Sequence, residues 1–293
     1  MATMKIVTVL LLAALSAMNS QPRATFDSGI AQVQEYGNRS GRPIILIPGL
    51  ACGPWVWDKQ ISALSGRYDV YALTFPGFDG RPMTGGDRLM QRAVDSVHML
   101  IATRHLHRPI VVGHSLGGTV AVMFGETYPH DASNIVTVEG GYPQAPTQAQ
   151  RNAAVSRSTA PYEHISQPQL AQALRNNMLQ YTITRPADVR RATMLAGRSD
   201  PRAIVEWMRA ALLLDLTPKL SAITVPFTAI IPFDPVIDPY QGFKTRAAKR
   251  AAYMAWVARA KDGKVIEISP SRHFVMIDRP RTFESALESA ISR

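Results

Sequence analysis

The chain has 293 residues, of which 46% are hydrophobic and 18% are charged, a composition typical of a globular protein and not of a disordered one. Lysine and arginine exceed aspartate and glutamate by 32 to 22. The basic residues are scattered and lack the interleaved aromatic side chains of a nucleic-acid interface, so we expect no nucleic-acid partner. The single cysteine, Cys52, excludes an intrachain disulfide and a cysteine-rich zinc site, and we expect no metal.

The first 20 residues resemble a secretory signal peptide. Lys5 is followed by an uncharged apolar run over residues 6–15, which is too short to span a bilayer, and small residues follow it. We therefore expect residues 1–20 to be removed and the mature protein to be secreted or periplasmic, without stable membrane insertion. An uncleaved membrane anchor is the alternative.

Short apolar runs alternate with helical patterns in the next part of the chain. Strands are predicted at 44–47, 69–74, 110–112 and 135–138, and helices at 87–105, with Asp87 as N-cap, and at 120–128. The strands are apolar throughout, as in a parallel sheet that is covered on both faces. The pattern predicts a doubly wound α/β fold with a mainly parallel sheet.

This alternation stops after residue 143. Residues 144–217 contain no convincing strand, and helical patterns lie at 169–179, 187–195 and 201–214. A strand at 225–231, a helix at 241–260, a strand at 265–268 and a helix at 282–291 follow. We therefore expect an α/β core formed by residues 21–143 and 218–293, with a helical cap inserted at 144–217. Arg246, Lys249 and Arg250 form the densest basic group, for which we expect a solvated face.

Residues 113–117 read Gly-His-Ser-Leu-Gly, between a predicted strand and a predicted helix. Such a turn strains the serine backbone and lifts the hydroxyl above the sheet edge. Glycine is needed two residues before and after the serine because a side chain there would clash. The pattern predicts Ser115 as a nucleophile, whereas a glycine-rich helix entry with an incidental serine is the alternative.

Residues 113–118, Gly-His-Ser-Leu-Gly-Gly, resemble the nucleophile elbow of the α/β-hydrolase family. Residues 44–50 resemble the oxyanion-loop segment of that family, and residues 71–78 resemble its next strand and loop. The resemblance covers residues 40–143 and 219–293.

One departure from the family lies in the oxyanion loop, where Pro48 stands in place of the histidine that many relatives carry before the glycine. The backbone role of the loop does not depend on that side chain. The resemblance implies that the N–H groups of Leu50 and Leu116 form the oxyanion hole.

A serine hydroxyl needs a base within hydrogen-bond reach, which this family supplies from a loop after its last strand. His273 follows the predicted strand at 265–268 and precedes the final helix, so we expect it to be the base. The other histidines lie on or near helices or in the cap, and His114 is expected to point elsewhere.

Three carboxylates are candidates for the acid that orients this histidine. Asp234 is the first choice because it follows the predicted strand at 225–231, where the family places its acid. The turn is one residue shorter than common versions, which leaves Asp238 as an alternative. Glu139 is the third candidate, because some relatives place the acid after the strand that ends at residue 138.

The resemblance implies a serine hydrolase that cleaves carboxylic esters of small to medium size through an acyl-enzyme, with no cofactor and a small-molecule ester as its partner. The alternatives are a lactone, amide or carbon–carbon bond hydrolase, a cofactor-free perhydrolase and a non-catalytic ligand-binding module. Five side chains in loops near the serine are pocket candidates, namely Trp55, Trp57, Phe78, Met83 and Tyr142.

Overall fold

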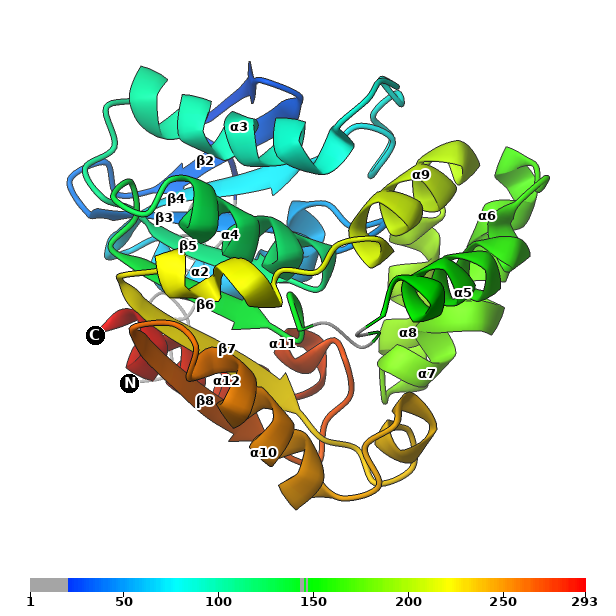
Figure 1. Cartoon of the computed structure of the whole chain (residues 1–293). Helices are drawn as coiled ribbons and strands as arrows, with labels where there is room; N and C mark the ends of the chain where they lie inside the picture. Colours follow the sequence, from blue (N-terminus) through cyan, green and yellow to red (C-terminus); the bar gives the residue numbers. More distant parts are fainter. Residues whose placement is uncertain (1–20, 143–144, 146) are drawn as a thin grey trace, which may run out of the picture.

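The centre of the computed structural model is one eight-stranded sheet with the strand order β1-β2-β4-β3-β5-β6-β7-β8 (Figure 1). The structure describes residues 21–142, 145 and 147–293, so the predicted signal peptide lies outside the described residues. The strands are β1 (Ala24–Ser28), β2 (Ala31–Gly37), β3 (Arg42–Ile47), β4 (Tyr68–Thr74), β5 (Ile110–His114), β6 (Asn134–Val138), β7 (Pro226–Pro232) and β8 (Asp262–Ile268).

The sheet is antiparallel only at one edge, where β2 pairs with β1 and β4, and is parallel from β4 to β8. Helices cover both faces because the middle strands are apolar on both sides. Helices α3 (Leu89–Thr103), α4 (Leu116–Thr127) and α10 (Arg246–Val257) cross the near face in Figure 1. Helices α2 (Asp58–Leu64), α11 (Val275–Asp278) and α12 (Pro280–Ile291) complete the core. The predicted fold class is confirmed.

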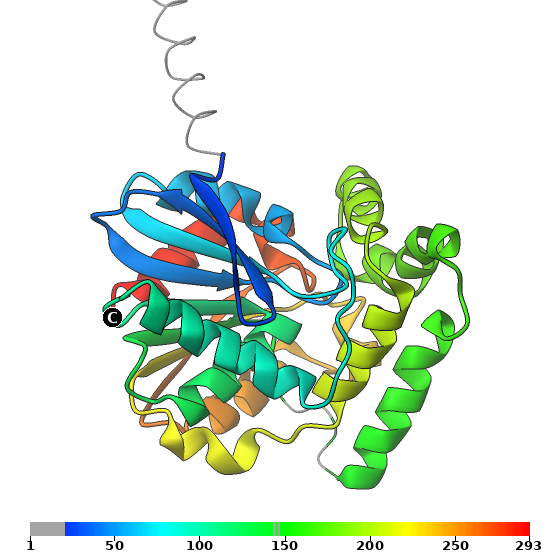
Figure 2. The ribbon, with the colours of Figure 1, turned by 90° about the horizontal axis from the view of Figure 1, so that it is seen from above.

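Five helices gather beyond the carboxyl ends of the parallel strands (Figures 1 and 2). They are α5 (Gln148–Thr159), α6 (Gln167–Leu174), α7 (Gln180–Thr182), α8 (Pro186–Ala196) and α9 (Pro201–Leu212), and we call residues 148–212 the cap. A capping box starts α5, where the Thr147 side chain accepts a hydrogen bond from the Gln150 amide at 3.2 Å. The cap lies within residues 144–217, for which the sequence predicts a helical insertion.

Trp207 joins the cap to the core. Its fully buried ring lies 4.9 Å from the ring of Phe75 and 5.8 Å from that of Phe78, measured between centroids. The indole N–H donates a hydrogen bond to the Pro76 carbonyl at 3.0 Å. One side chain thus supplies both apolar contact and a polar link between α9 and the loop after β4.

Several predicted helix starts differ from the structure. The helix predicted from residue 120 begins at Leu116. The helix predicted from residue 87 begins at Leu89, and its N-cap is Arg88 in the left-handed conformation, not Asp87. The helix expected from residue 241 begins at Arg246 because Thr245 caps it and accepts a hydrogen bond from the Ala248 amide at 3.1 Å. Within the described ranges, no helix combines the length and apolar character needed to cross a membrane.

Candidate active site

A cavity of about 770 Å³ lies between the cap and the carboxyl ends of the strands. The core contributes residues from the loop after β3, the β5–α4 turn, the segment after β6 and the loop after β8, while the cap contributes one face each of α5 and α9. Among the lining residues are Ser115, His273, Leu50, Leu116, Glu139 and Tyr142. The structure therefore brings the predicted nucleophile, base and oxyanion donors to one space.

Ser115 occupies a strained turn between β5 and α4. Its φ of 54° and ψ of −118° lie outside the regions that side chains favour. The Ser115 amide donates to the Val138 carbonyl at 3.0 Å, which ties the turn to β6. A Cβ at Gly113 would collide with the Gly117 carbonyl, and a Cβ at Gly117 would collide with the Ile47 carbonyl. Both glycines are thus required by close backbone approach.

Leu50 and Leu116 line the same cavity as Ser115. Neither backbone amide donates a hydrogen bond to another residue of the described ranges. Leu116 begins α4, so its N–H lies at the positive end of the helix dipole. This placement leaves two donors available to an oxyanion on a carbonyl attacked by Ser115.

His273 is partly buried and contacts the rings of His114 and Phe274. The His114 ring lies 4.8 Å from the His273 ring, and His114 Nε2 donates a hydrogen bond to the His273 carbonyl at 3.2 Å. Burial and, to a lesser extent, the ammonium of Lys249 together lower the pKa of His273 to about 4. His273 is therefore neutral at neutral pH, as a proton acceptor must be.

His114 has a part in the site that the sequence does not reveal. It is fully buried and does not line the cavity, yet it supports the backbone of His273. Burial and the neighbouring His273 lower the pKa of His114 well below its ordinary value. The only feature of the sequence that points to this role is the position of His114 directly before Ser115. The sequence does not show which way the His114 ring points.

Asp234 follows β7 and is held by backbone amides and a guanidinium. Its Oδ1 accepts hydrogen bonds from the amides of Val236 and Ile237 at 2.9 and 3.1 Å. Its Oδ2 accepts one from Arg272 Nε at 3.3 Å. Within the described part of the chain, no hydrogen bond joins His273 Nδ1 or Nε2 to Ser115 or to any of the three candidate carboxylates.

Glu139 and Asp238, the alternative acids, share a buried lysine. Lys249 Nζ lies 2.7 Å from Glu139 Oε1 and 2.6 Å from Asp238 Oδ1. The other oxygen of Asp238 accepts a hydrogen bond from the Asp234 amide at 2.7 Å. One ammonium thus links the ends of β6 and β7, where the three carboxylates lie.

The expectation of a solvated face for Lys249 is wrong, because this residue is only 1% exposed. Burial opposes its charge, but the attraction of Glu139 and Asp238 outweighs burial and raises the pKa of Lys249. Burial raises the pKa of Glu139 against the influence of Lys249. Glu139 has a φ of 44°, a strained conformation that this ion pair helps to hold.

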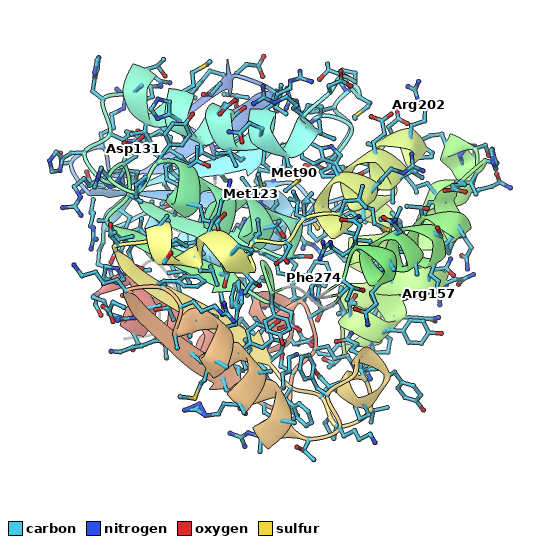
Figure 3. All side chains as sticks on the ribbon, viewed as in Figure 1. Met90, Met123, Asp131, Arg157, Arg202 and Phe274 are labelled. Atoms are coloured by element: carbon cyan, nitrogen blue, oxygen red, sulfur yellow. The ribbon has the colours of Figure 1, made fainter. Side chains whose placement is uncertain are left out.

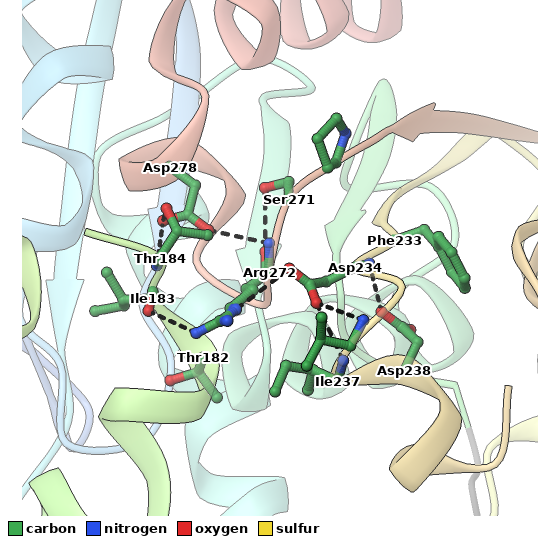
Figure 4. A network of polar contacts seen from close by, with 12 residues as sticks. Thr182, Ile183, Thr184, Phe233, Asp234, Ile237, Asp238, Ser271, Arg272 and Asp278 are labelled. Atoms are coloured by element: carbon green, nitrogen blue, oxygen red, sulfur yellow. Dashed lines mark hydrogen bonds and ion pairs between the residues drawn. The ribbon is translucent and has the colours of Figure 1, made fainter. Parts of the chain in front are cut away.

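The loop that carries His273 is tied to the cap (Figure 4). Arg272 Nη1 donates to the carbonyls of Gln180 and Ile183 at 3.1 and 3.2 Å. Asp278 Oδ1 accepts hydrogen bonds from the Thr184 amide and hydroxyl at 2.9 and 2.8 Å. The position of the His273 loop is therefore coupled to the segment between α7 and α8.

Of the five pocket candidates, only Tyr142 lines this cavity. Trp55, Trp57 and Phe78 are 7%, 0% and 0% exposed, so these three pocket predictions are wrong for this cavity. Trp57 packs on His114 and Phe283 at 6.4 and 6.2 Å between ring centroids. Met83 packs against the core beside Gly77 and is also absent from the lining. Trp57 thus packs within the core, and Phe78 is covered by Trp207 of the cap.

Cys52 is buried beside the oxyanion loop and is 1% exposed. Its thiol donates a hydrogen bond to the Leu50 carbonyl at 3.3 Å. Burial raises the pKa of the Cys52 thiol above its ordinary value. No group of three or more histidine, cysteine, aspartate or glutamate residues in the described ranges is arranged to hold a metal ion.

Comparison with known proteins gives the family. A model of the alpha/beta hydrolase family matches residues 44–286. The 1-acylglycerol-3-phosphate O-acyltransferase ABHD5 of Rattus norvegicus is 30% identical over 115 residues, which cover 38% of this chain and 33% of that protein. The (E)-2-((N-methylformamido)methylene)succinate hydrolase of Acinetobacter baylyi is 29% identical over 120 residues, which cover 41% and 45%. The chain thus spans less than half the length of these curated relatives.

The fold comparison agrees with the family match. The enol-lactonase from Burkholderia xenovorans LB400 superimposes with a TM-score of 0.75 at 16% identity, over 92% of this chain and 100% of that one, which is similarity of fold. The family predicted from the elbow and its flanking strands is therefore confirmed. This chain belongs to the alpha/beta hydrolase family.

Proposed function

We propose that this protein is a serine hydrolase that cleaves carboxylic esters of small to medium size through an acyl-enzyme. One observation carries the proposal. Ser115, on its strained turn, and the neutral His273 line one cavity. Leu50 and Leu116, whose backbone N–H groups donate no hydrogen bond within the described ranges, line it too. A volume of about 770 Å³ suits a small organic molecule rather than a polymer.

In the proposed reaction His273 accepts the Ser115 proton while the serine oxygen attacks the ester carbonyl. The amides of Leu50 and Leu116 stabilise the oxyanion of the tetrahedral intermediate. His273 then gives the proton to the leaving alcohol, and an attacking water releases the acid in a second cycle of the same steps. No cofactor takes part in this proposal.

Asp234 is the acid in this proposal. Its carboxylate accepts a hydrogen bond from Arg272, which lies in the His273 loop. Beside it, the Ser271 amide of the same loop donates to the Phe233 carbonyl at 3.1 Å. Glu139 and Asp238 instead neutralise Lys249. The acid accepts the His273 N–H and stabilises the imidazolium without taking its proton.

The test is hydrolysis of 4-nitrophenyl esters of graded acyl length, together with labelling by a fluorophosphonate. Ser115→Ala is expected to lose both, whereas Ser156→Ala, a serine on an exposed turn of α5 outside the cavity, keeps both. A folded wild-type protein that neither cleaves any ester nor takes the label contradicts the proposal. Lactones and carbon–carbon substrates would then be tested first.

The acid is identified by comparing Asp234→Asn with Glu139→Gln and Asp238→Asn. Loss of the acid that holds the catalytic histidine lowers kcat by about 10⁴. We expect the Asp234 variant to show this loss and the other two to lose stability instead. A larger kcat loss in the Glu139 variant would transfer the role to that residue.

We also propose that the protein is exported after removal of residues 1–20. The support is the cationic start and short apolar run of the sequence. Amino-terminal sequencing of the protein recovered from the periplasm or medium tests this, and a mature protein that begins at Met1 contradicts it.

A further inference from the structure

The cap carries much of the positive charge of the chain. Between residues 148 and 212 there are nine arginines and no lysine, against four carboxylates. Six of these arginines are held in ion pairs with carboxylates of the cap or core. The guanidinium groups of the other three, Arg157, Arg175 and Arg190, form no hydrogen bond or ion pair with any residue in the described ranges. Their charges are therefore open to a ligand.

Only one of these three, Arg157, lines the cavity that holds Ser115. Arg157 lies on α5 (Figure 3), on the same helix face as Gln150, Ala154 and Ser158, which also line the cavity. Arg151, a second lining arginine, is committed to the Ala145 carbonyl at 3.2 Å and to Asp215 at 3.7 Å. The acidic lining residue Glu139 is paired with Lys249, which it shares with Asp238.

The cavity lining is mixed, with apolar side chains beside polar ones such as Thr119, Gln150 and Gln241. Leu50, Leu116 and Tyr142 lie on the core side, and Met208, Leu212 and Leu214 lie on the cap side. Such a cavity accommodates an aliphatic chain, and at its cap wall it offers one uncompensated guanidinium. The single charge matches a carboxylate, whereas a phosphate monoester brings a charge close to −2 at neutral pH.

We infer that the preferred substrates are esters whose acyl chain ends in a carboxylate, bound by Arg157 while the ester carbonyl reaches Ser115. This inference rests on the proposed ester hydrolysis. Arg157 contacts the substrate far from the reacting carbonyl, so its contribution appears in KM and not in kcat. Because the guanidinium is exposed, added salt weakens the preference.

Kinetics test the inference with a matched pair of substrates, mono-4-nitrophenyl adipate and its neutral methyl ester. The wild type is expected to prefer the acid, and Arg157→Gln is expected to lower that preference by about fivefold, the effect of an exposed ion pair. Arg157→Lys retains part of the preference. Arg190→Gln, which removes an equally exposed charge on α8 outside the cavity, leaves it unchanged.

Binding separates this inference from the proposed function. Calorimetry with Ser115→Ala and monomethyl adipate measures recognition without turnover. Binding that weakens in Ser115→Ala/Arg157→Gln supports the carboxylate site even if no ester is cleaved. Equal binding in the two variants, or an equal loss of preference in Arg190→Gln, overturns the inference whatever the hydrolysis assays show.

Discussion

Lys249 illustrates how one residue can support a site that it does not enter. Its ammonium compensates Glu139 and Asp238, and Asp238 in turn holds the backbone of Asp234. Replacing a buried ion-pair partner leaves the remaining charges uncompensated, which costs more than the pair itself contributes. The turn that carries Asp234 therefore depends on Lys249. In the sequence, this lysine looks like any other basic residue of a helix.

For Lys249→Met we expect the free energy of unfolding at pH 7 to fall by about 3–5 kcal/mol. The two stranded carboxylates would have pKa values in the folded state above those in the unfolded state. The folded state then binds more protons, so the deficit shrinks as the pH falls. Denaturation in urea at pH 7 and pH 5 measures both effects.

The control for this experiment is Lys244→Met. Lys244 is exposed, so its replacement should change the unfolding free energy by no more than about 0.5 kcal/mol. Equal effects of the two substitutions, or a Lys249→Met deficit that grows toward acid pH, would show that the buried ion pair does not stabilise the fold.

His273 leads to a prediction for the pH dependence of catalysis. Only the neutral imidazole accepts the Ser115 proton, and the pKa of His273 is lowered to about 4. We therefore expect kcat/KM to remain high through pH 5 and to fall with a midpoint near 4, where an unperturbed histidine would give about 6.5. His130→Gln, at an exposed histidine, should leave the midpoint in place, while a wild-type midpoint near 6.5 would contradict the burial argument.

The same shift affects stability in a defined range. Between about pH 6.5 and pH 4 the unfolded chain takes up a proton at this histidine and the folded chain does not. The contribution of His273 to the free energy of unfolding therefore falls as the pH drops through that range.

The sequence predicts the candidate site residues whose proposed roles depend on backbone geometry and chain order. Ser115 follows from glycines that the close approach of β5 and α4 requires, and His273 follows from its place after the last strand. Lys249 and His114 are missed, because burial on the inner side of a helix or under an adjacent loop depends on tertiary packing. The same reason explains why Trp57 and Phe78 are packing residues instead of pocket walls.

At the scale of elements, the parallel strands are the most predictable part of the molecule. The hairpin of β1 and β2 is not predicted, because its more buried residues alternate with more exposed ones and form no continuous apolar run. Helix α5 is missed for a related reason, since only Val155 and Thr159 are buried along it. Both elements lie at a surface, where one polar face weakens the pattern that burial produces.

The ties between the His273 loop and the cap predict a second measurable effect. For Arg272→Ala we expect the unfolding free energy to fall by about 2 kcal/mol, because Asp234 and two cap carbonyls lose a charged donor. The amides of Thr184 and Phe274, which bond across this junction, should exchange hydrogen faster. Hydrogen exchange resolved by residue measures this, with exposed Arg281→Ala as the control, and unchanged exchange at both amides would contradict the coupling.

For the whole molecule, Trp207 supplies a large buried apolar contact between cap and core. Trp207→Ala should cost about 3–5 kcal/mol of unfolding free energy, since a large buried ring is removed. Trp207→Phe keeps ring contact and loses the bond to Pro76, at about 1 kcal/mol.

Substrate binding provides a second readout of this junction. The alanine variant should also raise KM for esters, because α9 forms one wall of the cavity. Thermal denaturation and ester kinetics measure the two effects. A similar loss of stability in the two variants would mean that the hydrogen bond, and not the ring, holds the cap.

The position of Cys52 has a practical consequence. Because the only thiol of the chain is buried and resists ionisation, maleimide dyes should leave the native protein unlabelled. Cysteines placed at Met194 on the cap and Val236 on the core, which are 67% and 62% exposed, would therefore accept a donor and an acceptor fluorophore without background. Energy transfer between them would report in real time whether the cap moves against the core when an ester binds.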